Sequence, residues 1–196
     1  MSYYNSEIFP HIRQNFLDQD ICKQLIDYAE HNENLYEHVT NYEFWNKRIM
    51  NHNKMSEPIR AVLENINTDV NQVLQSLDIM KKPMYPDTLQ IVRWFKDLEL
   101  PPHADREHPD GKPNPFPWRD FATVIYLNDN YSGGEIYWPN KNISHSPKTG
   151  DLAIFPGTRE FLHGVKKVVE GTRYTIGSFF TYDSRYVLRE FRERLS

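Results

Sequence analysis

The sequence predicts a mainly β protein with helices (α+β), in which an antiparallel sandwich or barrel follows a helical first half. Two observations predict this class. Apolar residues recur with helical spacing in two segments before residue 80. Beyond residue 85, short runs of β-branched and aromatic residues alternate with Gly, Pro and Asn. Because no helical pattern separates these runs, we expect their strands to pair antiparallel.

Two segments, 18–31 and 56–78, carry the helical pattern. Asp18 or Asp20 is available to cap the first turn of the earlier helix. We expect both helices to pack their apolar stripes on the core. The stripes comprise Ile21, Leu25, Ile26 and Ala29 in the first helix and Ile59, Val62, Leu63, Ile66, Val70, Val73, Leu74 and Leu77 in the second. Residues 32–55 show no clear periodicity.

The second half is expected to hold most of the strands. Segment 106–120 contains four prolines and one glycine and is expected to form a long loop of the lid or binding type. Residues 184–195 return to a helical pattern, with Val187, Leu188, Phe191 and Leu195 on one side. The expected strands lie at 88–95, 121–127, 134–138, 151–155, 161–168 and 173–182, with weaker ones near 102–105 and 142–145.

Length and composition restrict the class of protein. The chain has 196 residues, which suits one domain with a helical support region (1–85), a β core (86–182) and a C-terminal helix (183–196). A net charge of -4 argues against a nucleic-acid partner. The single cysteine, Cys22, excludes an intrachain disulfide and a cysteine-based zinc site. No signal peptide or membrane-length apolar segment is recognised, so we expect a cytoplasmic protein without a membrane partner.

A short polar pair, His103 and Asp105, follows two prolines in the stretch LPPHAD. Residues two apart on a strand point to the same side, so these two side chains are expected to aim together. That geometry suits two ligands of one metal ion, although a surface pair or a hydrogen-bonded couple is the commoner outcome. His163 is the candidate third ligand because it lies in an apolar strand segment. Taken alone, it would be interpreted as a buried structural histidine.

Arg173 supplies the context for His163, because it follows ten residues later at the start of the last expected strand. Its face of that strand includes Thr175, Gly177 and Phe179, and the glycine is expected to leave space for a ligand. A buried guanidinium needs a carboxylate partner, and an external dicarboxylate would satisfy it. Two histidines and one aspartate bind one face of an octahedral ion, which is the arrangement of non-heme Fe(II) sites.

Five segments occur in one order along the chain: IRQNFLDQDICKQLIDYAE, HAD, YLNDNYSGGEIYWP, GDLAIFPG and HGVKKVVEGTRYTIGSFF. Together they resemble the 2-oxoglutarate- and Fe(II)-dependent dioxygenases, and within them the prolyl 4-hydroxylase-like family. The resemblance implies a double-stranded β-helix, or jelly roll, with the N-terminal helices packed on the larger sheet. It also implies that His103, Asp105 and His163 are the iron ligands. By the same resemblance, Arg173 pairs with the distal carboxylate of 2-oxoglutarate and Tyr126 donates a hydrogen bond to it.

Several positions depart from the pattern of the family. Trp94 stands nine residues before His103, where many relatives carry a tyrosine, so that contact with the cosubstrate is expected to be either missing or reshaped. Ala122 replaces the usual threonine, and Phe179 replaces the tryptophan of many relatives. The expected cosubstrate-binding set comprises Arg173, Tyr126, Trp94 and Thr175.

The resemblance implies an enzyme that couples the oxidative decarboxylation of 2-oxoglutarate to hydroxylation, using Fe(II), dioxygen and ascorbate as reductant. A peptidyl proline is the expected substrate. Loop 106–120 and the aromatic segment 36–45 are expected to hold an extended peptide, with ordinary packing of that segment as the alternative. Two other functions stay open: hydroxylation of a free amino acid or other small molecule, and a non-catalytic metal- or ligand-binding jelly roll that holds zinc.

Overall fold

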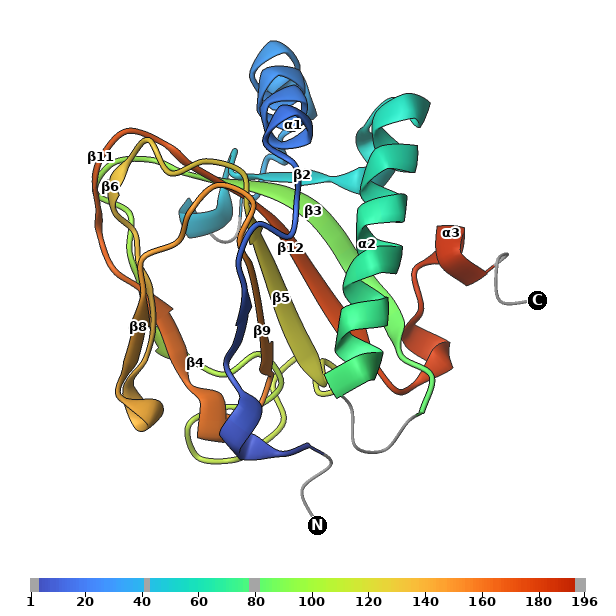
Figure 1. The fold of residues 1–196 in the computed structure, drawn as a ribbon, viewed down its shortest axis with the longest axis vertical. Helices are drawn as coiled ribbons and strands as arrows, with labels where there is room; N and C mark the ends of the chain where they lie inside the picture. The colour runs from blue at the N-terminus through green and yellow to red at the C-terminus, as the bar shows by residue number, and fades with distance from the viewer. Residues whose placement is uncertain (1–3, 41–42, 78–81, 193–196) are drawn as a thin grey trace.

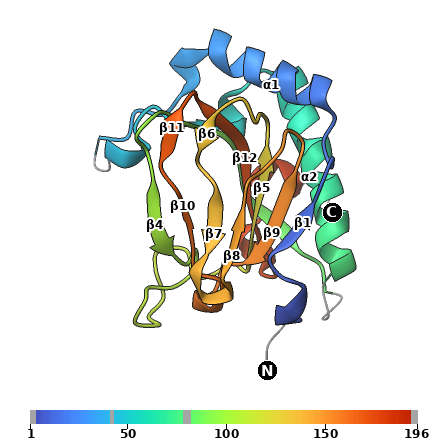
Figure 2. The same ribbon diagram turned by 60° about the vertical axis from the view of Figure 1, so that its left-hand side comes forward.

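Two antiparallel sheets face each other in the computed structural model, which describes residues 4–40, 43–77 and 82–192 (Figures 1 and 2). The larger sheet has the order β1 (His11–Arg13), β9 (Leu152–Pro156), β5 (Phe121–Tyr126), β12 (Arg173–Thr181), β3 (Tyr85–Trp94) and β2 (Ile49–Asn51). The smaller sheet has the order β4 (Leu100–His103), β10 (His163–Val165), β7 (Ile136–Trp138) and β8 (Ile143–His145). A short pair joins β11 (Val168–Glu170) to β6 (Ser132–Gly133). The predicted jelly roll is confirmed.

Two long helices pack on the core, and α1 crosses the ends of the strands (Figure 2). Helix α1 (Gln19–His31) begins where the Asp18 carboxylate accepts a hydrogen bond from the amide of Asp20 at 2.8 Å. Helix α2 (Glu57–Leu77) lies along the outer face of the larger sheet (Figure 1). The hydroxyl of Ser178 on β12 donates to Asn67 Oδ1 on α2 at 2.7 Å, so a buried polar contact fixes the helix on the sheet. No helix among the described residues is long and apolar enough to cross a membrane.

Two expected strands differ in the structure: one is divided, and another is preceded by a short extra strand. The expected strand 161–168 divides into β10 and β11, because the exposed Lys166 and Lys167 separate two strands that pair in different sheets. The expected strand 134–138 is preceded by β6, which ends at Gly133. Gly133 and Gly134 have φ values of 71° and 69°, and a Cβ on Gly133 would lie 2.1 Å from the carbonyl oxygen of Lys167. Only glycine allows this close turn.

The prediction of one continuous helix over 184–195 is wrong. The chain forms a 3-10 turn, η7 (Ser184–Tyr186), and then the short helix α3 (Arg189–Arg192). Val187 separates the two because its backbone is extended, with φ -62° and ψ 137°. Val187 and Phe191 are buried, as the apolar stripe predicts, whereas Leu195 lies outside the described residues.

The segment 32–55, undecided from the sequence, contains β2 and three short 3-10 helices, η2 (Glu33–Leu35), η3 (Glu43–Trp45) and η4 (His52–Lys54). Its aromatic residues mostly pack inside the molecule. Tyr36 is 2% exposed and lies under the guanidinium of Arg93, with Cζ 3.8 Å from the ring centroid. Phe44 and Trp45 pack on Trp94, and Tyr42 lies outside the described residues. Tyr36 therefore contributes to the internal packing and does not form part of a lid over a peptide-binding site.

We predict that Leu63→Ala lowers the free energy of unfolding by about 2 to 5 kcal/mol, because Leu63 is fully buried between α2 and the sheet. Asn65→Ala on the exposed side of the same helix is the matched control and should change stability little. Chemical denaturation measures both variants. Equal stability of the two variants would contradict the packing of α2 described above.

Candidate active site

Strand pairing in the smaller sheet brings the two candidate histidines together. His163 on β10 lies directly opposite His103 on β4, and their ring centroids are 4.4 Å apart. The neighbouring Gly164 makes this pairing possible. A Cβ at Gly164 would lie 2.7 Å from both the carbonyl oxygen of Leu100 and the ring of Tyr137. The backbone of β10 is thereby held close between β4 and β7.

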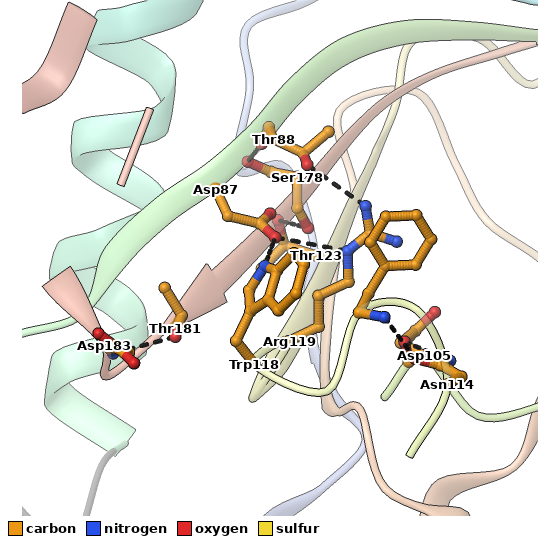
Figure 3. A network of polar contacts seen from close by, with 11 residues as sticks. Asp87, Thr88, Asp105, Asn114, Trp118, Arg119, Thr123, Ser178, Thr181 and Asp183 are labelled. Carbon is orange, nitrogen blue, oxygen red and sulfur yellow. Dashed lines mark hydrogen bonds and ion pairs between the residues drawn. The ribbon is translucent and has the colours of Figure 1, made fainter. Parts of the chain in front are cut away.

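Asp105 reaches the two histidines from a loop and not from a strand. Strand β4 ends at His103, so the expectation of side-by-side positions on one strand was wrong. Instead, the amide of Asp105 donates to the carbonyl oxygen of Gly157 at 3.0 Å, and Asn114 Nδ2 donates to the carbonyl oxygen of Asp105 at 2.9 Å (Figure 3). These contacts turn the carboxylate inward, where Asp105 is 7% exposed.

The three side chains converge with the geometry of a metal site. Asp105 Oδ1 lies 3.7 Å from His103 Nε2, and Asp105 Oδ2 lies 3.8 Å from His163 Nε2. Their candidate ligand atoms all lie within 4.8 Å of one another. The two separations are too long for hydrogen bonds, and Oδ2 is buried without a partner. A buried carboxylate oxygen that lacks a hydrogen-bond partner is suited to bind a cation placed among the three groups.

Both imidazoles are held in the tautomer that a metal needs. Nδ1 of His103 donates to the carbonyl oxygen of Pro101, and Nδ1 of His163 donates to that of Phe161, each at 3.2 Å. The lone pair of each Nε2 is therefore left for the cation. Burial lowers the pKa of His163 to about 4, while the Asp105 charge opposes this shift. His163 is neutral at physiological pH and free to act as a ligand.

The metal-ligand cluster opens into a pocket of about 550 Å³ between the two sheets. Trp94, Arg173 and Thr175 line it, as does Gly177. A Cβ on Gly177 would meet no atom closer than 3.7 Å, so open space lies beside this glycine, as expected, and an added methyl group would fit there without a clash. Tyr126 is fully buried beside Arg173 and is not among the lining residues.

Arg173 is an uncompensated cation next to this pocket. It is 2% exposed, and its Nε has no hydrogen-bond partner. Its Cζ lies 5.3 Å from the ring centroid of Trp94 and 5.0 Å from that of Tyr126. The hydroxyls of Tyr126 and Tyr131 are likewise buried without partners. Burial raises the pKa of both tyrosines, and the charge of Arg173 opposes the rise, so both stay protonated donors.

Tyr131 and Arg119 were not singled out from the sequence. Tyr131 lies in the segment that joins β5 to β6, where its spacing carries no periodic signal. Arg119 lines the pocket, with its Cζ 3.9 Å from the ring centroid of Phe116 and 3.7 Å from that of Phe179. Its Nε lies 3.5 Å from Asp87 Oδ2, which also accepts a hydrogen bond from Trp118 Nε1 at 2.7 Å (Figure 3). A side chain of the proline-rich loop thus reaches the pocket.

Comparison with known proteins agrees with this geometry. Residues 89–181 match the family model of the 2OG-Fe(II) oxygenase superfamily. Prolyl 3-hydroxylase 2 from Homo sapiens is 33% identical over 102 residues, covering 46% of this chain and 14% of that protein. Prolyl 3-hydroxylase 1 from Rattus norvegicus is 24% identical over 180 residues, covering 78% of this chain and 25% of that protein. The chain therefore corresponds to only a small part of these relatives.

Two solved structures share the fold. One is the viral collagen prolyl hydroxylase from Paramecium Bursaria Chlorella virus-1 in complex with 2OG, with a TM-score of 0.67, 18% identity and coverage of 91% of this chain and 96% of that one. The other is the Trichoplax adhaerens prolyl hydroxylase in complex with a hypoxia inducible factor peptide fragment, with a TM-score of 0.68, 17% identity and coverage of 94% and 86%. At this identity the two structures confirm the fold, and the resemblance to 2OG-Fe(II) oxygenases is confirmed by the family model over residues 89–181.

We predict that Gly157→Ala weakens metal binding by about 10- to 100-fold, because its Cβ would lie 2.4 Å from the carbonyl oxygen of Arg119 and 3.3 Å from Asp105 Cβ. The carbonyl that holds the Asp105 amide would then shift. Titration with Mn(II) measures the affinity. Gly177→Ala, whose new methyl group meets only ordinary contacts, is the matched control. Wild-type affinity in a folded Gly157→Ala variant would show that Gly157 does not place Asp105.

Proposed function

We propose that this chain is an Fe(II)- and 2-oxoglutarate-dependent oxygenase that hydroxylates a prolyl residue of a peptide or protein. One observation carries the proposal: a pocket holds a buried carboxylate oxygen without a partner among two imidazoles and, beside it, a buried guanidinium without a counter-ion. Such a pocket suits a cation together with an organic anion. A non-catalytic binding module would hold the same two ligands without turnover, and the succinate assay below distinguishes it from an enzyme.

In this proposal His103, Asp105 and His163 hold the iron. Together they would supply two imidazole nitrogens and one carboxylate oxygen, which is the donor set of non-heme Fe(II) sites that keep positions open for other ligands. When bound, Fe(II) with 2-oxoglutarate supplies the oxidative chemistry, in which decarboxylation to succinate accompanies hydroxylation of the substrate. The contribution of the chain is to hold two imidazoles and one carboxylate in fixed positions.

The cosubstrate is held by the cationic end of the pocket. Arg173 pairs with the distal carboxylate, and the hydroxyls of Tyr126 and Tyr131 lie beside that guanidinium as further donors. Trp94 covers Arg173 with an aromatic ring, which keeps water from the ion pair. Thr175, on the same face of β12, lines the pocket between this end and the open side.

The substrate class rests on the relatives. The curated relatives are prolyl 3-hydroxylases, and one similar structure is a prolyl hydroxylase bound to a peptide. The pocket offers a matching surface at its rim, where Phe116 is 41% exposed and stacks against Arg119. An apolar ring and a nearby donor suit a prolyl ring and a peptide carbonyl. The proposed substrate is therefore a proline-containing peptide that reaches the pocket past loop 106–120.

We predict that His163→Ala or Asp105→Ala lowers succinate formation on the order of 100-fold or more, since each removes a ligand of the iron. The assay contains Fe(II), ascorbate and 2-oxoglutarate. His145→Ala is the control, because His145 lies on β8 beside Asp151 at 3.3 Å and outside the metal-ligand cluster. Loss of turnover in His145→Ala, with retention in His163→Ala, would mean that the wrong histidine had been assigned.

We predict that Arg173→Ala weakens 2-oxoglutarate binding by about 10- to 100-fold, because a charge-assisted hydrogen-bonded pair is lost. Affinity for Mn(II) should change little in the same variant, since Arg173 is not a metal ligand. Calorimetric titration of each ligand separates the two effects. Equal weakening of both ligands would reject the role of Arg173.

A mass-spectrometric search for one added oxygen tests the substrate class. The panel contains proline-rich peptides, the same peptides with every proline replaced by alanine, and free amino acids. Oxidation of the proline peptides alone is the expected result. Oxidation of a free amino acid, with no reaction on any peptide, would replace the proposed substrate class.

A further inference from the structure

A second buried guanidinium lies behind the pocket. Arg48 directly precedes β2 and is 2% exposed. Its Nε donates to the carbonyl oxygen of Arg93 at 3.1 Å, and its Nη1 donates to that of Phe44 at 2.7 Å. Its Nη2 is buried and has no hydrogen-bond partner. The rings of Phe44 and Trp45 also face this guanidinium, with its Cζ 4.3 and 4.7 Å from their centroids. Aromatic rings stabilise the cation without neutralising its charge, and the Nη2 donor stays unmet.

Arg48 and Arg173 share one aromatic neighbour, Trp94. The Cζ of Arg48 lies 4.1 Å from the ring centroid of Trp94, and the Cζ of Arg173 lies 5.3 Å from it. Trp94 is also the direct partner of Arg173 across the β3–β12 pairing and lines the pocket. Each cation is attracted to the electron-rich face of an indole at such distances. The three side chains therefore form one unit at the anion-binding end of the pocket.

No internal acid neutralises this unit. Within the described parts of the chain, no carboxylate lies within 4.0 Å of either guanidinium. Burial first, and then the charge of Arg173, lower the pKa of Arg48 to about 9, so Arg48 still carries its charge at neutral pH. Two like charges in a weakly screened interior repel each other, and an anion in the pocket relieves that repulsion.

We infer that Arg48 is a positioning residue for the cosubstrate, and that its charge makes the pocket select a 2-oxo acid with two carboxylates over one with a single carboxylate. The inference rests on the proposed function. Arg48 does not line the pocket, so it acts through Trp94, which it holds beside Arg173, and through the positive potential that it adds at the distal carboxylate.

The test uses Arg48→Met, which keeps the length and apolar contacts of the side chain, and Arg48→Lys, which keeps the charge. Binding of 2-oxoglutarate and of 2-oxopentanoate, which lacks the second carboxylate, is measured by tryptophan fluorescence on the Mn(II)-loaded protein. Arg48→Met should bind 2-oxoglutarate about tenfold more weakly and 2-oxopentanoate no more than about twofold more weakly. The reason is that only 2-oxoglutarate carries a second carboxylate, which interacts with the positive charge that the substitution removes. Arg48→Lys should recover most of the loss.

Thermal unfolding of the ligand-free protein provides the second measurement. Arg48→Met should unfold at a temperature close to that of wild type, since removal of a buried cation offsets the loss of its two hydrogen bonds and its ring contacts. A lower unfolding temperature, together with equal losses for both 2-oxo acids, would show that Arg48 is only structural. Unchanged binding of both acids would also overturn the inference. A wild-type protein that does not prefer 2-oxoglutarate over 2-oxopentanoate would reject the proposed function itself.

Discussion

The position of the Asp105 carboxylate is the constraint on which the site depends. This group is buried between two imidazoles, and one of its oxygens has no hydrogen-bond partner. A carboxylate in that position is tolerable only with a cation beside it. The pairing of β4 with β10 and the carbonyl oxygen of Gly157 both serve to create the position.

Arg173, which lines the same pocket, has the complementary requirement. Arg173 is buried without a counter-ion, and Arg48 adds a second positive charge behind Trp94. The pocket therefore suits a cation among the metal-ligand residues and a negative charge beside Arg173. A ligand that chelates a metal through one end and carries a carboxylate at the other satisfies both requirements. The pocket therefore supports 2-oxoglutarate as the ligand independently of the sequence motifs.

The sequence predicted the elements whose pattern is local. Both long helices and the main strands follow from apolar spacing, and the three metal-ligand candidates were found by their residue types. The reason given for Asp105 was wrong, because its orientation comes from a contact with Gly157, far away in the chain. Arg48 was missed since segment 32–55 has no periodicity, and nothing in a sequence shows that a guanidinium is buried without a partner. Tyr131 was missed because the segment that joins β5 to β6 has no periodic pattern either.

The most direct measurement is an anaerobic titration of the protein with Fe(II) and 2-oxoglutarate, followed by visible absorption. A chelate of the 2-oxo acid on iron absorbs in the visible range, whereas either component alone on the protein does not. We predict that the absorption appears only when both are present and saturates at one iron per chain. Binding of iron without this absorption, or saturation at another ratio, would contradict a single site that holds both the metal and the cosubstrate.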